Sequence, residues 1–196
     1  MNIPNKISLI RIISIPVFAF FYLATFIPNG WGKIIALILF AVTAVTDFVD
    51  GYIARKYNMV TDLGKFLDPI ADKLHMSTGL LLVLADGTML APYGVIMAII
   101  IIAREFIVSA FRIIAASKNV VLAADILGKI KANFQPFGIA LFMFLAIHNE
   151  APFLGGAELA ITIIAYVVMG IATLFTIISA INYLVKNKSV LSEGKK

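Results

Sequence analysis

The chain has 196 residues, of which 61% are apolar and 14% are charged, and its mean hydropathy is +1.00. Soluble domains contain about 45–50% apolar and about 25% charged residues, so this composition excludes a water-soluble globule. The formal net charge is +5, but the basic residues interrupt apolar runs, so we interpret them as topology markers and expect no nucleic-acid partner. There are no cysteines, which excludes disulfides and thiolate chemistry.

Six segments are long and apolar enough to cross a membrane, which takes about 20 residues for a hydrocarbon core of about 30 Å. In chain order they are residues 8–28, 33–56, 66–85, 90–116, 133–149 and 158–185. Turn-forming or polar residues separate them, including Pro28-Asn29-Gly30, Asp86-Gly87 and the stretch from His148 to Gly156. The sequence therefore predicts an all-α integral membrane protein, with six transmembrane helices in one bundle and a single domain over residues 1–196.

The first segment has a basic start at Lys6 and Arg11, as a signal peptide does. No convincing small-residue cleavage site follows it, and five further apolar segments do, so we predict a helix that is retained. Pro4 and Asn5 are expected in a short interfacial stretch before this helix.

Basic residues in the short loops and near the ends of the apolar segments predict the orientation. With the N-terminus inside, fourteen of them fall on the inner side: Lys6, Arg11, Arg55, Lys56, Lys65, Lys73, Arg112, Lys118, Lys129, Lys131, Lys186, Lys188, Lys195 and Lys196. The outer side keeps only Lys33, and Arg104 lies within a span. Because cytoplasmic loops are enriched in Lys and Arg, both termini are expected in the cytoplasm.

Five of the eleven acidic residues lie between positions 47 and 72. Asp47 and Asp50 are spaced i, i+3 and Asp68 and Asp72 are spaced i, i+4, so each pair shares one face of its helix. Two antiparallel helices joined by a short loop can direct these four carboxylates to one point at the cytoplasmic side. Asp62 is expected in the loop and is not a predicted ligand.

Four carboxylates gathered at a membrane boundary repel one another and resist desolvation, and divalent cations relieve both problems. Oxygen ligands without His or Cys favour Mg²⁺ or Mn²⁺ over Zn²⁺. Two such ions on shared carboxylates suit phosphoryl transfer. Nearby, Gly51 and Ala54 leave a helix surface that a ligand can approach closely, and Arg55 suits a phosphate.

The spacing Asp-x2-Asp-Gly-x2-Ala-Arg-x8-Gly-x3-Asp-x3-Asp, which runs from Asp47 to Asp72, resembles the signature of the CDP-alcohol phosphotransferase family. All eight fixed positions match: Asp47, Asp50, Gly51, Ala54, Arg55, Gly64, Asp68 and Asp72. The six-span plan extends the resemblance over nearly the whole chain.

The resemblance implies a membrane-bound transferase with two divalent cations, Mg²⁺ or Mn²⁺, on Asp47, Asp50, Asp68 and Asp72. It implies that Asp72 is also the general base, which deprotonates the acceptor hydroxyl so that this oxygen attacks the lipid-side phosphorus of a CDP-linked lipid and CMP leaves. The implied residues for the CDP-lipid are Asn5, Gly51, Ala54, Arg55 and Gly64. A homodimer in a bacterial inner or plasma membrane, with its catalytic face in the cytoplasm, is also implied.

A second group of charges bears on the acceptor. Arg104 lies inside a predicted span and needs a partner. Glu105 points about 100° away around the helix, so a bound anion or an aspartate of the cluster is the better candidate. Arg112 follows at i+8, near the same face. For Lys129 and Lys131, ordinary positive-inside topology is as good an explanation as function.

Four short motifs are similar to the family members that make phosphatidylglycerophosphate: Asn2-Ile-Pro-Asn5, Asp68-Pro-x-Ala-Asp72-Lys73, Arg104-Glu105-x6-Arg112 and Gly128-Lys129-x-Lys131. This similarity implies CDP-diacylglycerol as donor and sn-glycerol 3-phosphate as acceptor. The implied residues for the acceptor phosphate are Arg104, Arg112, Lys129, Lys131 and Lys73. The chain departs from the usual Gly-Lys-x-Lys-Thr at Ala132, where a hydroxyl donor is lost.

Other functions fit the sequence less well. A different acceptor, such as inositol phosphate or phosphatidylglycerol, keeps the same chemistry. A divalent-cation transporter would need acids near the midplane, and the outer half of the chain offers none that match. A prenyltransferase gives the Gly-x2-Ala-Arg spacing no role. His75, three residues after Asp72, is interpreted as a polar packing residue.

Overall fold

The computed structural model describes residues 3–56, 62–118 and 126–187. Within the helices, some side chains lie outside the description, namely those of residues 3–7, 47–56, 62–63, 65–66, 116–117 and 126–130.

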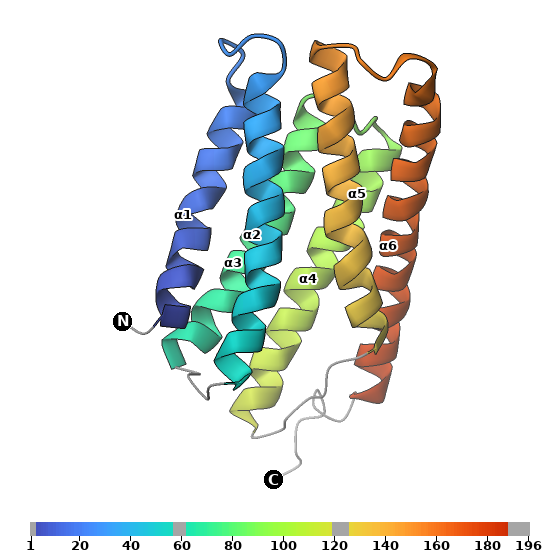
Figure 1. The fold of residues 1–196 in the computed structure, drawn as a ribbon. Helices are drawn as coiled ribbons and strands as arrows, with labels where there is room; N and C mark the ends of the chain where they lie inside the picture. Colours follow the sequence, from blue (N-terminus) through green and yellow to red (C-terminus); the bar gives the residue numbers. More distant parts are fainter. Residues whose placement is uncertain (1–2, 57–61, 119–125, 188–196) are drawn as a thin grey trace.

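Six long helices account for most of the described chain, and all of the described secondary structure is helical. The helices are α1 (Ile3–Leu23), α2 (Trp31–Lys56), α3 (Asp62–Ala85), α4 (Tyr93–Ser117), α5 (Ile126–Glu150) and α6 (Glu158–Lys186), with one 3₁₀ turn at Gly155–Ala157. Successive helices run in opposite directions, so α1 begins and α6 ends at the same end of the bundle (Figure 1). The predicted all-α class is confirmed.

The observed bounds of α1 differ from the prediction. Pro4 and Asn5 belong to the first turn of α1 instead of a separate lead-in, because a proline is tolerated where its missing N–H would have no helical acceptor. The helix ends at Leu23, five residues before the predicted end, and a turn with Asn29 and Gly30 at positive φ leads into α2.

Two further bounds also differ. Asp62, predicted in a loop, is the first residue of α3. Helix α5 begins at Ile126, seven residues before the predicted span, so Lys129 and Lys131 lie within the helix. Backbone hydrogen bonding continues the helix beyond the apolar stretch that hydropathy detects.

The helices form two groups of three. Helix α1 packs against α2 and α3, and α6 packs against α5 and α4. The groups meet where α5 contacts α2 and α3 and where α3 contacts α4. Phe18, Phe40, Ile139, Phe142 and Met169 belong to the buried core between them.

Two helical segments of the described chain are long and apolar enough to cross a membrane, namely Tyr93–Ala115 and Gly155–Lys186. Shorter apolar stretches lie at Ser8–Leu23 in α1 and Trp31–Thr46 in α2. Large apolar side chains are exposed along the bundle, for example Phe106, which is 63% exposed. These are features of a membrane protein, and the crossing of all six helices stays a prediction.

A close helix contact fixes the position of α3 relative to α2 and α5. A Cβ atom added to Gly79 would lie 2.7 Å from Cε2 of Phe40 on α2 and 2.9 Å from Cγ2 of Ile139 on α5. Both neighbours are buried, so neither can move aside easily. Gly79 follows Asp72 by two helical turns on the same face, so this contact also positions Asp72.

Charged groups are paired at the end of the bundle where α1 ends, which we call the far end (Figure 1). Lys33 is 8% exposed, and its Nζ lies 3.0 Å from Oδ2 of Asp86 and 3.0 Å from Oε1 of Glu150. The Tyr22 hydroxyl donates a hydrogen bond of 2.5 Å to the same Asp86 oxygen. These contacts connect α1, α2, the end of α5 and the turn after α3.

We expect Gly79→Ala to lower the stability of the bundle by about 1–3 kcal/mol, because the added methyl group overpacks a buried contact. Thermal unfolding of the purified protein in detergent measures this effect. Gly170→Ala is the matched control, since a Cβ there meets nothing within 4 Å and alanine favours a helix. Equal melting temperatures for the two variants would contradict the close-contact assignment.

Candidate functional site

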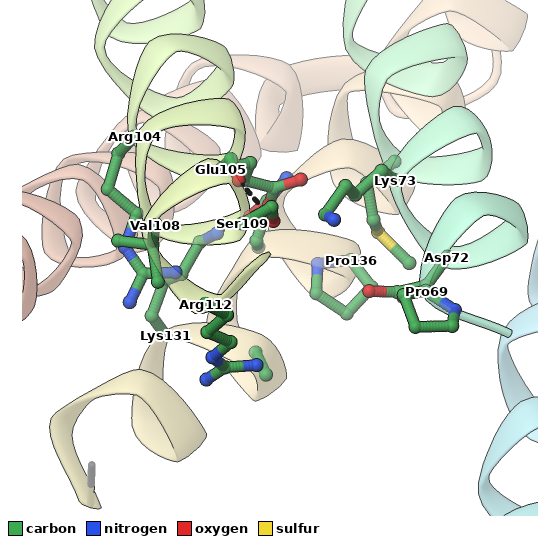
Figure 2. Close-up of a pocket in the computed structure, with 13 residues that line it drawn as sticks. Pro69, Asp72, Lys73, Arg104, Glu105, Val108, Ser109, Arg112, Lys131 and Pro136 are labelled. Atoms are coloured by element: carbon green, nitrogen blue, oxygen red, sulfur yellow. Dashed lines mark hydrogen bonds and ion pairs between the residues drawn. The ribbon is translucent and has the colours of Figure 1, made fainter. Parts of the chain in front are cut away.

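A cavity of about 190 Å³ lies between α3, α4 and α5, in the half of the bundle where α1 begins. Its lining is rich in charged groups, which come from three helices (Figure 2). The charged lining residues are Asp72, Lys73, Arg104, Glu105, Arg112 and Lys131. Four cations and two carboxylates give this wall a formal charge of +2.

The two arginines of the cavity are held by hydroxyl groups from α6. A terminal nitrogen of Arg104 donates a hydrogen bond of 2.8 Å to Oγ of Ser179, which is fully buried. Nε of Arg112 donates one of 3.3 Å to the Tyr183 hydroxyl, and its guanidinium carbon lies 5.7 Å from the centre of that ring. Helix α6 therefore orients both guanidinium groups from behind the cavity wall.

Lys131 forms a short ion pair across the cavity wall. Its Nζ lies 2.5 Å from Oε1 of Glu105, and the two side chains are 6% and 10% exposed. Lys131 precedes the predicted span at 133–149. Burial lowers the pKa of Lys131, although the Glu105 carboxylate opposes this shift by favouring the charged ammonium.

Asp72 faces the basic side chains from α3. In Figure 2, Asp72 and Pro69 lie on one side of the cavity, and Arg104, Arg112 and Lys131 lie on the other. Asp72 is exposed, so a ligand can reach its carboxylate. The arrangement can bind a polyanion beside a carboxylate that can accept a proton.

A second cavity, of about 480 Å³, also borders Asp72 and is lined from α1, α2, α3 and α5. It shares Asp72, Met76, Ala132 and Pro136 with the first cavity. Arg11 is 4% exposed and contributes its main basic group. Asp72 thus lies where two separate cavities meet.

His75 lines this second cavity but packs against aromatic rings. It is 2% exposed, and its ring centre lies 4.4 Å from that of Phe40 and 5.5 Å from that of Phe18. This environment is that of the packing residue that the sequence predicted.

The rest of the acidic motif is described in part. Asp68 is exposed and accepts a hydrogen bond from the buried hydroxyl of Ser8 on α1, and Gly64 is buried in the first turn of α3. The side chains of several predicted site residues lie outside the described ones. These residues are Asn5 on α1, Asp47, Asp50, Gly51, Ala54 and Arg55 near the end of α2, and Lys129 on α5.

The described side chains contain no group of three or more His, Cys, Asp or Glu residues that could hold a metal ion. Only Asp68 and Asp72 among the four predicted ligands have described side chains. The predicted metal site is therefore not tested by this geometry.

Sequence reasoning missed Ser8, Ser179 and Tyr183 and treated Glu105 only as a doubtful partner of Arg104. One signal was available, since Ser179 and Tyr183 are polar groups at i, i+4 in a strongly apolar helix. An acid inside a predicted span, as Glu105 is, also indicates a function or a buried partner.

Residues 1–185 match the model of the CDP-alcohol phosphatidyltransferase family. A relative from Bacillus subtilis (strain 168), named CDP-diacylglycerol--glycerol-3-phosphate 3-phosphatidyltransferase, is 40% identical over 202 residues, which cover 97% of this chain and 97% of the relative. Proteins of the same name from Rickettsia felis and Escherichia coli (strain K12) are 35% and 36% identical. These matches cover 93% and 73% of this chain, and 93% and 77% of the relatives.

The family match spans almost the whole chain, and it includes every residue that lines the two cavities. Together with relatives of 35–40% identity, it shows that this chain belongs to the CDP-alcohol phosphatidyltransferase family.

Proposed function

We propose that this protein transfers the phosphatidyl group from CDP-diacylglycerol to sn-glycerol 3-phosphate and so forms phosphatidylglycerophosphate and CMP. The observation that carries this proposal is the position of Asp72 beside a cavity with four basic side chains. The names of the Bacillus and Rickettsia relatives support it.

The acceptor fits the cavity by charge. A phosphate monoester carries a charge of about −1.5 to −2 at pH 7, which matches the formal +2 of the lining. Arg104, Arg112, Lys131 and Lys73 would bind its phosphate, and Lys129 is proposed to join them. Arginine suits this role because its planar group donates two parallel hydrogen bonds to phosphate oxygens.

The donor is assigned to the other side of Asp72. We assign its CDP group to Asn5, Gly51, Ala54, Arg55 and Gly64, the residues that the family signature and the N-terminal motif supply. Its glycerol backbone would reach the second cavity. With the acceptor in the first cavity, the two substrates would meet at the residue that both cavities share.

Two divalent cations, Mg²⁺ or Mn²⁺, are proposed to be held by Asp47, Asp50, Asp68 and Asp72. The donor set fits such ions, since it consists of carboxylate oxygens alone. When bound, the ions would neutralise charge on the phosphate oxygens and on the departing CMP. The Ser8 hydroxyl orients one of these carboxylates through its hydrogen bond to Asp68.

In the proposed reaction, Asp72 takes the proton from the primary hydroxyl of glycerol 3-phosphate. That oxygen forms a new bond to the phosphorus that carries the diacylglycerol, and the bond from this phosphorus to the bridging oxygen of CMP breaks. CMP leaves with the electron pair of that bond. The basic cavity holds the acceptor so that its hydroxyl lies beside Asp72, which makes the step effectively unimolecular.

We also propose that the chain crosses the membrane six times, with both termini in the cytoplasm and the two cavities at the cytoplasmic side. The positive-inside bias supports this orientation. We further propose one catalytic domain, a homodimer, and location in a bacterial inner or plasma membrane.

The function is tested with purified protein in detergent, CDP-diacylglycerol and Mg²⁺ or Mn²⁺, by following CMP release with each candidate acceptor. We expect release to depend on glycerol 3-phosphate. Release with inositol phosphate or phosphatidylglycerol alone would refute the acceptor. No release with any acceptor would refute the transferase.

Asp72→Asn should reduce turnover by at least about a hundredfold, since general-base catalysis contributes about 10²–10⁴ in rate. CDP-diacylglycerol should still bind, as a binding assay with labelled donor would measure. Turnover close to that of the unmodified protein would exclude Asp72 as the base.

Arg104→Ala should raise the KM for glycerol 3-phosphate by about tenfold or more, because a hydrogen bond between charged groups contributes about 1.5–3 kcal/mol. The KM for CDP-diacylglycerol should change little. Lys186→Ala is the matched control, since it removes an exposed cation from the last turn of α6 and this residue does not line the cavity. A loss of affinity confined to CDP-diacylglycerol would contradict this assignment and would place Arg104 in the donor site.

A further inference from the structure

We propose that Glu105 is a positioning residue for the acceptor: its carboxylate holds the Lys131 ammonium at the cavity wall, where that ammonium binds the phosphate of glycerol 3-phosphate. The inference rests on the proposed function, because it concerns the acceptor cavity. It assigns a role to an acidic residue in a site that must attract an anion.

The ion pair lines the cavity and joins α4 to α5, which is not among the main packing partners of α4. Helix α4, which carries Glu105, packs against α6 and α3, whereas Lys131 lies on α5. Both residues line the cavity, and their charged atoms are 2.5 Å apart. A pair whose purpose was only to join helices would be expected where the helices touch.

The burial of the two partners shows why Lys131 needs a countercharge. Lys131 is 5% exposed, and an isolated ammonium in such a place would shed its proton or turn towards water. Glu105 removes both alternatives. It favours the charged form of Lys131, and it fixes the nitrogen at one point.

The hydrogen-bonding capacity of the pair leaves room for a ligand. An ammonium has three N–H donors, and Glu105 accepts from Lys131 through Oε1. The remaining donors of Lys131 can serve a phosphate. The other oxygen of the carboxylate, Oε2, is buried and has no hydrogen-bond partner among the described residues, an arrangement that stability alone does not favour.

Glu105 also limits the charge of the cavity. Without it, the described lining would carry a formal +3 instead of +2. Glu105 thus weakens the general attraction of the cavity for anions, but it holds one hydrogen-bond donor, the Lys131 ammonium, in a fixed position. This arrangement is useful only if the exact position of the phosphate matters, as it does when the hydroxyl of glycerol 3-phosphate must reach Asp72.

The test is a double-mutant cycle with Glu105→Gln, Lys131→Met and the double variant, assayed for CMP release at varied glycerol 3-phosphate. We expect Glu105→Gln and Lys131→Met each to raise the KM for the acceptor about tenfold, with little change in the KM for CDP-diacylglycerol. The double variant should match Lys131→Met. Glu158→Gln, an isosteric change at an exposed carboxylate at the start of α6, is the control and should leave both KM values unchanged.

Two outcomes would overturn the inference. One is an unchanged or lower acceptor KM in Glu105→Gln. The other is a further rise in the double variant over Lys131→Met, because Glu105 would then act independently of the ammonium. If Glu105→Gln does not fold, the double variant carries neither charge, and its comparison with Lys131→Met decides the question.

A measurement without turnover separates this inference from the proposed function. Calorimetric titration with inorganic phosphate should show weaker binding to Glu105→Gln than to the unmodified protein. Absence of glycerol 3-phosphate-dependent CMP release by the unmodified protein refutes the proposed function, and the phosphate titration then still tests the pair. Equal phosphate affinities refute the role of Glu105 whatever the acceptor is.

Discussion

Charged groups inside an apolar bundle must be compensated, and this constraint organises both ends of the molecule. At the far end, Lys33 lies between Asp86 and Glu150, and Tyr22 donates to the same aspartate. That network joins four parts of the chain, and the opposite charges in it lie next to one another. Its composition is that of a structural ion-pair network, since the Lys33 ammonium contacts two carboxylates.

The cavity end satisfies the same constraint in a different way. The partners that α6 supplies to Arg104 and Arg112 are hydroxyl groups, which orient a guanidinium without cancelling its charge. Lys131, in contrast, is paired with a carboxylate, that of Glu105. The two ends differ accordingly. The ammonium of Lys33 is fully compensated by carboxylates of the fold, whereas the cavity lining keeps a formal charge of +2 that a ligand can use.

The sequence allowed the number, order and approximate length of the helices to be predicted, because hydropathy over about 20 residues is a local property. It did not place Asp62 or the start of α5 correctly, since helices continue through polar residues that hydropathy assigns to loops. Asp72, Arg104 and Arg112 line one cavity, and their roles in the predicted site stay predictions.

The partners of these charged groups could not be predicted with the same methods. The periodicity of a helix correctly separated Glu105 from Arg104 by about 100° but could not show that Glu105 meets Lys131, 26 residues later. The contacts of Ser179 and Tyr183 with the two arginines likewise depend on how α6 packs against α4. Contacts between distant segments depend on the packing of whole helices, which no short window of sequence records.

Pro136 has a consequence for the backbone of α5. Proline has no N–H, so the carbonyl oxygen of Ala132, four residues earlier, cannot receive its usual helical hydrogen bond. Both residues border both cavities. At the position where a threonine would offer a hydroxyl, this chain has a methyl group and a peptide oxygen without its normal donor. The polarity of that turn is therefore supplied by the main chain, which a change of side chain at position 132 would leave in place.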